Sequence, residues 1–80
     1  MRYFFNIDGA VSDPDEEGIE LPTITEARTE AVRFAAEYLR ERPETAWLGD
    51  EFRVEVTNAD ALILFTFIAI GVDAPAGMGK

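Results

Sequence analysis

The chain of 80 residues contains no cysteine and no histidine, and its only serine and only lysine are Ser12 and Lys80. Without cysteine the protein can form neither a disulfide nor a thiolate metal site. Without histidine and cysteine, the Ser-His-Asp and Cys-His catalytic arrangements cannot be assembled within one chain. Paired carboxylates can hydrolyse glycosides, but so short a chain offers little wall for a substrate cleft. We therefore expect a protein that is not an enzyme and that carries no cofactor.

Positive charge is scarce. Lys and Arg together number 7, against 16 Asp and Glu, which gives a formal net charge of −9. Such a field repels nucleic-acid phosphates and anionic membrane surfaces, so neither is an expected partner. It favours solubility and, where a partner exists, a basic protein.

Long hydrophobic runs are scarce as well. The apolar run of residues 62–72 is interrupted by Thr66 and Gly71, and it is too short to cross a bilayer as a helix. Residues 1–8 lack the apolar segment of a secretory signal. With neither a signal nor a disulfide, we expect a cytoplasmic protein.

Alternating apolar residues predict strands. Near the N-terminus, Tyr3, Phe5 and Ile7 would share one face of a strand, and their aromatic and β-branched side chains suit a half-buried sheet. A loop before the third strand carries Trp47 and Leu48, which we expect to cap an open end of the core. The predicted strands are residues 2–7, 19–21, 52–57 and 61–70.

Residues 24–42 predict one amphipathic helix. Thr23 and Glu26 fit a capping box at its start, and Pro43 ends it. One side of this helix is an apolar stripe at 3.6-residue spacing. The stripe consists of Ile24, Ala27, Ala31, Phe34, Ala35, Tyr38 and Leu39.

The order of elements predicts an α+β fold. Two hairpins flanking one helix form a two-layer β-β-α-β-β sandwich, in which an antiparallel sheet carries the amphipathic helix on one face. Residues 1–70 make a single domain, and residues 71–80 make a flexible tail rich in Gly, Ala and Pro. A domain of this size buries only about 60% of its unfolded surface, which favours a homo-oligomer or a protein partner.

The acidic turn of residues 8–18 is one candidate site. Asp13, Asp15 and Glu17 place oxygens at positions one, three and five of a calcium-loop pattern, and Gly18 follows at position six. A carboxylate is absent where the pattern requires its bidentate ligand. The alternative is a solvated turn in which the glycine takes a left-handed conformation.

The last strand is a second candidate site, because it is apolar on both faces. A strand of a two-layer domain normally has one polar face, and an uncovered aromatic patch marks an interface. The alternative is that the loop of Trp47 or the C-terminal tail folds over it. The candidate interface residues are Phe4, Ile63, Phe65 and Phe67.

Several short segments follow one another in a specific order and spacing. They are Tyr3-Phe4-Phe5-Asn6-Ile7, Asp8-Gly9, Asp15-Glu16-Glu17-Gly18-Ile19-Glu20-Leu21-Pro22, Ala27-Arg28-Thr29-Glu30-Ala31, Glu55-Val56 and residues 62–67. Together they resemble a family of short bacterial proteins of unknown function, whose members open with Tyr-Phe-Phe-His-Ile and carry an Asp-Glu-x-Gly-x-Glu-Leu-Pro turn. Asn6 stands where that family usually has His. The resemblance implies a β-β-α-β-β domain with no catalytic residues to transfer.

A weaker likeness is to HicB-type antitoxins, which also begin with a Tyr-containing strand, an acidic Gly turn and an Ala-rich helix. It concerns architecture, which does not fix function. The sequence thus supports an unknown function, with a small non-enzymatic interaction domain that self-associates through its last strand as the first hypothesis. The alternatives are an antitoxin-like regulator that binds a basic protein, and a weak carboxylate-based calcium or ligand binder.

Overall fold

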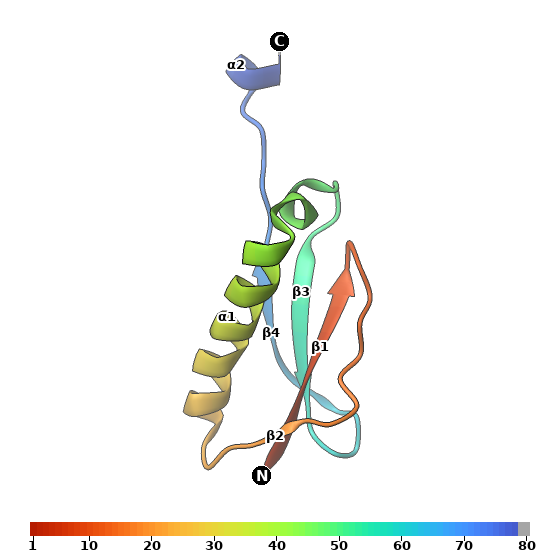
Figure 1. The fold of residues 1–80 in the computed structure, drawn as a ribbon, viewed down its shortest axis with the longest axis vertical. Helices are drawn as coiled ribbons and strands as arrows, with labels where there is room; N and C mark the ends of the chain where they lie inside the picture. Colours follow the sequence, from red (N-terminus) through yellow and green to blue (C-terminus); the bar gives the residue numbers. More distant parts are fainter. Residues whose placement is uncertain (79–80) are drawn as a thin grey trace.

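The computed structural model describes residues 1–78. One four-stranded antiparallel sheet, in the order β2-β1-β3-β4, carries the long helix α1 on one face (Figure 1). The predicted α+β arrangement is confirmed. The elements are β1 (Arg2–Gly9), β2 (Ile19–Glu20), α1 (Ile24–Glu41), η1 (Pro43–Trp47), β3 (Phe52–Thr57), β4 (Ile63–Ala69) and α2 (Pro75–Met78).

Strands β1 and β3 form the centre of the sheet and the floor of the core. Their antiparallel register runs from Phe4 opposite Thr57 to Gly9 opposite Phe52. Because cross-strand partners share a face, alternate residues of both strands turn toward α1. The six buried side chains, at most 3% exposed, are Tyr3, Phe5, Ile7, Phe52, Val54 and Val56.

Helix α1 lies close to the sheet because its inward stripe is built from alanine. Ala27, Ala31 and Ala35 are buried in the core. At the helix start, the Thr23 hydroxyl accepts a hydrogen bond from the Glu26 amide at 3.2 Å, as the capping box predicted. The helix ends one residue before the predicted boundary.

Strand β4 departs from simple alternation because it contains a bulge next to Thr57. Val56 lies opposite Phe65. The next residue of β3, Thr57, lies opposite Ile63, so Leu64 is left over as the extra residue. Ile63 therefore shares the face turned away from α1, whereas Phe65 shares the face turned toward it. Sequence periodicity alone had placed both on one face.

The loop between α1 and β3 does not cap the core as the sequence suggested. Trp47 and Leu48 are 60% and 56% exposed, and the buried residue of η1 is Thr45. The indole of Trp47 lies over Gly71, where an added Cβ atom would come 2.7 Å from the ring. The Gly71 amide donates to the Ala46 carbonyl at 2.9 Å. The loop thus fixes the chain where it leaves β4.

After β4 the chain leaves the body of the domain and reaches the four-residue helix α2 (Figure 1). A tail without regular structure was expected over residues 71–80, of which 79–80 lie outside the described residues. Pro75 begins α2, a position where its missing N–H needs no partner. None of the helices in residues 1–78 combines the length and apolar character needed to cross a bilayer.

The close approach of α1 to the sheet can be tested with one substitution at two positions. Ala31→Leu inserts a larger side chain into the buried stripe, so we expect it to destabilise the fold by about 1–3 kcal/mol. Ala36→Leu makes the same change on the exposed side of α1 and should stay within about 0.5 kcal/mol. Urea unfolding followed by circular dichroism measures both. Equal losses would contradict the packing described.

Candidate functional site

The two edges of the sheet are treated differently by the chain. On the β1 side, β2 pairs with Arg2 and Tyr3, and the acidic loop then continues along the same edge. The amide of Ile7 donates to the carbonyl of Asp13 at 3.0 Å, and the Asp13 amide donates back at 2.9 Å. This edge is therefore covered by the loop of residues 10–18.

The carboxylate of Asp15 closes the gap that remains in this edge. It accepts hydrogen bonds from the amides of Phe5 at 3.1 Å, Glu17 at 3.0 Å and Gly18 at 3.1 Å. Burial raises the pKa of Asp15, but these three hydrogen bonds and the nearby Arg2 outweigh it and hold the pKa below its ordinary value of 3.8. A charged Asp15 is thus part of the folded structure.

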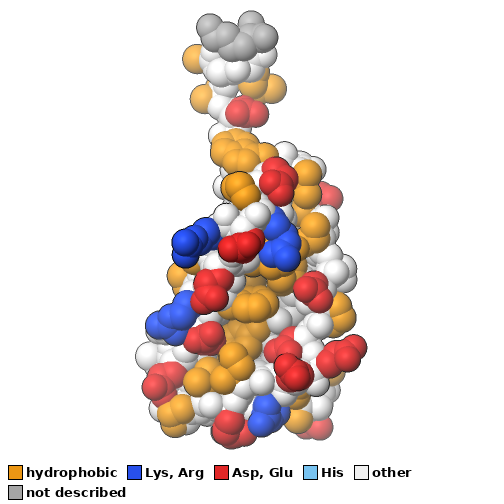
Figure 2. Space-filling view, viewed as in Figure 1, with side chains coloured by type: hydrophobic (Ala, Val, Ile, Leu, Met, Phe, Trp, Pro, Cys, Tyr) orange, Lys and Arg blue, Asp and Glu red, His pale blue; other side chains and the backbone are white. Residues whose placement is uncertain are grey.

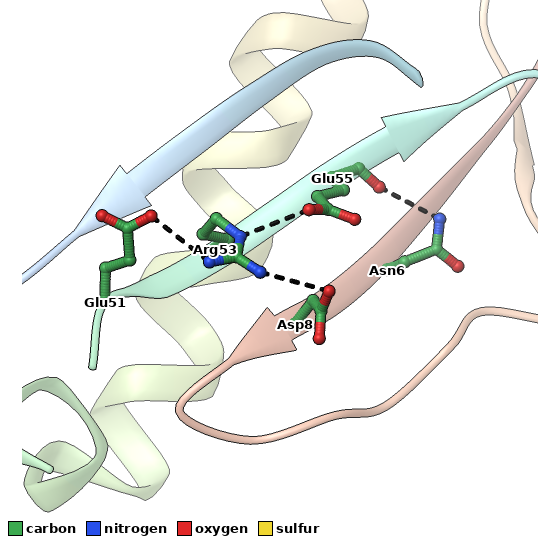
Figure 3. Close-up of polar contacts among 5 residues, drawn as sticks. All are labelled: Asn6, Asp8, Glu51, Arg53 and Glu55. Atoms are coloured by element: carbon green, nitrogen blue, oxygen red, sulfur yellow. Dashed lines mark hydrogen bonds and ion pairs between the residues drawn. The ribbon is translucent and has the colours of Figure 1, made fainter. Parts of the chain in front are cut away.

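Asn6 joins three segments on the face turned away from α1. Its Nδ2 donates to the Glu55 carbonyl at 3.0 Å (Figure 3). The same nitrogen donates to the Thr57 hydroxyl at 3.2 Å. Its Oδ1 accepts from the Asp15 amide at 2.9 Å. One amide side chain therefore connects β1, β3 and the acidic loop.

These contacts bear on the predicted calcium ligands. Both oxygens of Asp15 are engaged by backbone amides. Within residues 1–78, Asp13, Asp15 and Glu17 do not gather into a group of carboxylates that could hold a metal ion. Gly18 has φ +74°, the left-handed conformation that the alternative to a calcium loop predicted for this glycine. The hydrogen bonds of Asp15 and Asp13 show that the acidic turn closes an edge of the sheet.

Arg53 lies at the centre of a charged cluster on the same face as Asn6. Its guanidinium forms ion pairs with Asp8 at 3.2 Å, Glu51 at 3.3 Å and Glu55 at 3.2 Å (Figure 3). The hydrogen bond with Glu51, joined by the other two carboxylates, raises the pKa of Arg53 against the opposing effect of desolvation. The face over β1 and β3 is therefore polar, with one cation among three carboxylates.

The β4 edge has the opposite character. It carries no charged residue, and within the described chain β4 pairs only with β3. Large aliphatic side chains on and beside it remain exposed, and neither the Trp47 loop nor residues 71–78 of the tail cover them. They are Leu62 at 62%, Ile63 at 58%, Ile68 at 49% and Ile70 at 51%.

The structure separates the four residues that the sequence grouped as one patch. Phe4 and Ile63 lie on the face turned away from α1, in one cross-strand row with Thr57 between them. Phe65 and Phe67 lie opposite Val56 and Val54 and pack against the core while remaining partly exposed. The bulge at Leu64 is the reason that Ile63 and Phe65 lie on different faces, whereas the face of Phe4 follows from the alternation of β1.

Several residues that shape the site were missed by sequence reasoning. Ile68 lies opposite Arg53 and so faces away from α1, as part of the exposed edge. Asn6 and Arg53 carry the polar network of the same face. A strand partner of opposite character could have identified Ile68, because an apolar residue that lies opposite a charged one shares its solvent-exposed face. Sequence patterns alone do not fix which residues of β3 and β4 lie opposite each other, so this pairing was not predicted.

On the helix side, hydrophobic side chains form a strip flanked by carboxylates and arginines (Figure 2). Two aromatic contacts lie beneath this side. The rings of Phe5 and Phe34 are 6.2 Å apart, and those of Tyr38 and Phe52 stack at 5.3 Å. Both pairs join α1 to β1 or β3, so the helix is anchored over the two central strands.

The fold and its surfaces define a small two-layer α+β domain with one open, apolar sheet edge. The chain belongs to the family described as a domain of unknown function, DUF6894, whose sequence model matches residues 2–70. This confirms the resemblance to a short domain of unknown function. No curated protein and no solved structure matches the chain. The likeness to HicB-type antitoxins gains no support from these comparisons.

The role of Asp15 predicts a stability change at neutral pH. Asp15→Asn removes one of the two acceptor oxygens that serve three amides, so it should cost about 1–3 kcal/mol. Asp13→Asn is the matched control, because it removes the same charge from a side chain that makes no hydrogen bond within residues 1–78. Urea unfolding at pH 7 measures both variants. A loss as large in the control would refute the assigned role.

The same substitution predicts a pH dependence. Because the pKa of Asp15 is lowered on folding, its contribution is present above the ordinary value of 3.8 and is lost as the pH falls through the folded-state pKa. The stability difference between wild type and Asp15→Asn should therefore narrow when the pH falls below 3.8. Unfolding curves from pH 7 to strongly acidic buffer test this, and a constant difference would contradict it.

Proposed function

We propose that this domain is a small, non-enzymatic protein-interaction domain that self-associates through β4. The observation that carries the proposal is the contrast between the two sheet edges. One edge is closed by β2 and the loop of residues 10–18, whereas on the other edge the apolar strand β4 pairs, within residues 1–78, with β3 alone. Natural proteins usually protect a free edge with charges, proline or a covering segment, and such an edge is a template for another strand.

The distribution of charge supports β4 over other surfaces. The longest stretch of the sequence without a charged residue is 61–72, which contains all of β4. Contact between two copies elsewhere would bring together surfaces of a chain whose net charge is −9. Contact through the sheet face would also bury the Arg53 cluster, with a desolvation cost that favours leaving it in water.

Binding of a basic protein by the acidic loop has less support. The Asp15 carboxylate is engaged by three amides, and Glu20 pairs with the N-terminal amine and with Arg2. The carboxylates most firmly held in place thus already have internal partners. We place the domain in the cytoplasm, which suits a chain without cysteine.

Size sets the expected strength of association. A strand of seven residues is about 23 Å long, so its edge buries less surface than a standard interface of about 800 Å² per partner. We therefore expect a dissociation constant in the micromolar range, about 1–100 μM. Sedimentation equilibrium over this range of concentration is the appropriate measurement.

A charge placed on the β4 edge should abolish the association. Ile68→Lys puts an ammonium group on the exposed edge, and we expect the dissociation constant to rise at least about tenfold. Val32→Lys is the matched control, because Val32 is equally exposed, at 49%, but lies on α1. Both variants change the net charge alike. Unchanged association in Ile68→Lys, or equal loss in both, would argue against β4.

Salt separates self-association from binding of a basic partner. Raising the salt from about 0.1 M to about 1 M shortens the Debye length from about 10 Å to about 3 Å, which screens repulsion between the acidic copies. Self-association through an uncharged strand should strengthen, whereas a complex with a basic protein should weaken. Sedimentation at both salt concentrations measures the change. Association that weakens with salt would favour the alternative.

A further inference from the structure

Rotational symmetry restricts how two copies of β4 can pair. When two identical antiparallel strands are related by a two-fold axis, that axis runs perpendicular to the sheet, so each face of one copy continues into the same face of the other. Residues equally far before and after the centre of pairing then lie opposite each other on one face. Two residues can share a face in this way only when the two-fold axis passes beside one residue of the strand, which then lies opposite its own copy. We call this residue the centre of the register.

The sequence of β4 is nearly symmetric about its middle residue, Thr66. Phe65 and Phe67 flank it on the face toward α1. The next residues outward, Leu64 and Ile68, are both aliphatic, but Leu64 is the bulge residue and packs against the core, whereas Ile68 faces away from α1, so the symmetry of the faces covers residues 65–67. A centre on Phe65 or on Phe67 would form one aromatic pair and would place Thr66 against an aliphatic side chain. A centre on Thr66 forms two aromatic pairs within the regular part of the strand.

We propose that β4 pairs with β4 of a second copy, antiparallel and centred on Thr66, so that two four-stranded sheets join into one sheet of eight strands. This inference rests on the proposed function and names its partner and register. The two Thr66 hydroxyls face each other across the new pair of strands, on the face turned away from α1. Within each copy, Thr66 is also the cross-strand partner of Glu55. Both α1 helices lie on the same side of the joined sheet.

The charges at the ends of β4 agree with this register. Asp60 and Asp73 are the first charged residues on either side of the strand. With the centre on Thr66, Asp60 of one copy lies near Asp73 of the other copy. Both aspartates are then at the outer ends of the paired strands. The paired part of the strands is therefore free of charge, and the like charges that approach each other remain in solvent.

The absence of cysteine allows a direct test. Thr66→Cys introduces the only thiol into an exposed position of the chain. In the proposed register the two thiols face each other across strands whose Cα atoms are about 4.5–5.5 Å apart, which a disulfide can bridge. Mild oxidation should link the copies at least about tenfold faster than free thiols at about 100 μM, because the dimer gives a millimolar effective concentration.

Ile68→Cys is the control on the same edge. In the proposed register, residue 68 of one copy lies opposite residue 64 of the other. The two introduced cysteines are therefore four residues apart, about 13 Å along the strands, and a disulfide cannot join them. Sedimentation of both reduced variants gives the dimer fraction of each, so that linking rates are compared at equal dimer fraction, and denaturing urea should remove the difference in linking rate. Hydrogen exchange of the wild type gives an independent measurement, since protection of residues 64–68 should rise with protein concentration.

The outcomes separate the two proposals. Fast linking of Thr66→Cys with slow linking of Ile68→Cys, in a protein that associates, supports the register. Association with equal linking of both variants, or faster linking of Ile68→Cys, would overturn the register and leave self-association through β4 standing. A wild type that stays monomeric to millimolar concentration, without concentration-dependent exchange, would overturn both.

Discussion

A carboxylate that takes the place of a neighbouring strand determines the architecture of this domain. Asp15 accepts the Phe5 amide, which would otherwise point to open solvent at the edge of β1, and orders its own turn by accepting the Glu17 and Gly18 amides. Asn6 then ties the turn to β3. With β2 only two residues long, this loop lets β1 serve as an interior strand.

The single helix explains why the opposite edge differs. Its alanine stripe and the Phe5–Phe34 and Tyr38–Phe52 contacts hold α1 over β1 and β3. The aromatic side chains of β4 reach the core from the side and stay partly exposed. Within residues 1–78 α1 is the one long helix, and it lies over β1 and β3, so β4 keeps apolar character on both faces and pairs along one side only.

Local rules were sufficient for most of the fold. Alternation in β1 and β3, the Thr23 cap and the alanine spacing of α1 each predicted what the structure shows. The faces of β4 could not be predicted, because one extra residue, Leu64, reverses the alternation and no local signal marks it. The role of Asp15 was also hidden, since a carboxylate that accepts distant amides looks the same in sequence as a calcium ligand or a solvated turn.

The closed edge on the β1 side of the sheet also bears on how many copies could assemble through their sheet edges. An open sheet with two free edges would add copies without limit, which is the route to fibres. In the proposed dimer, pairing through β4 would use the long edge strand of each copy, and the outer edges of the joined sheet would be the two-residue β2 strands and the loops of residues 10–18. In that proposed arrangement, the loop that completes β1 would also limit the assembly to two copies.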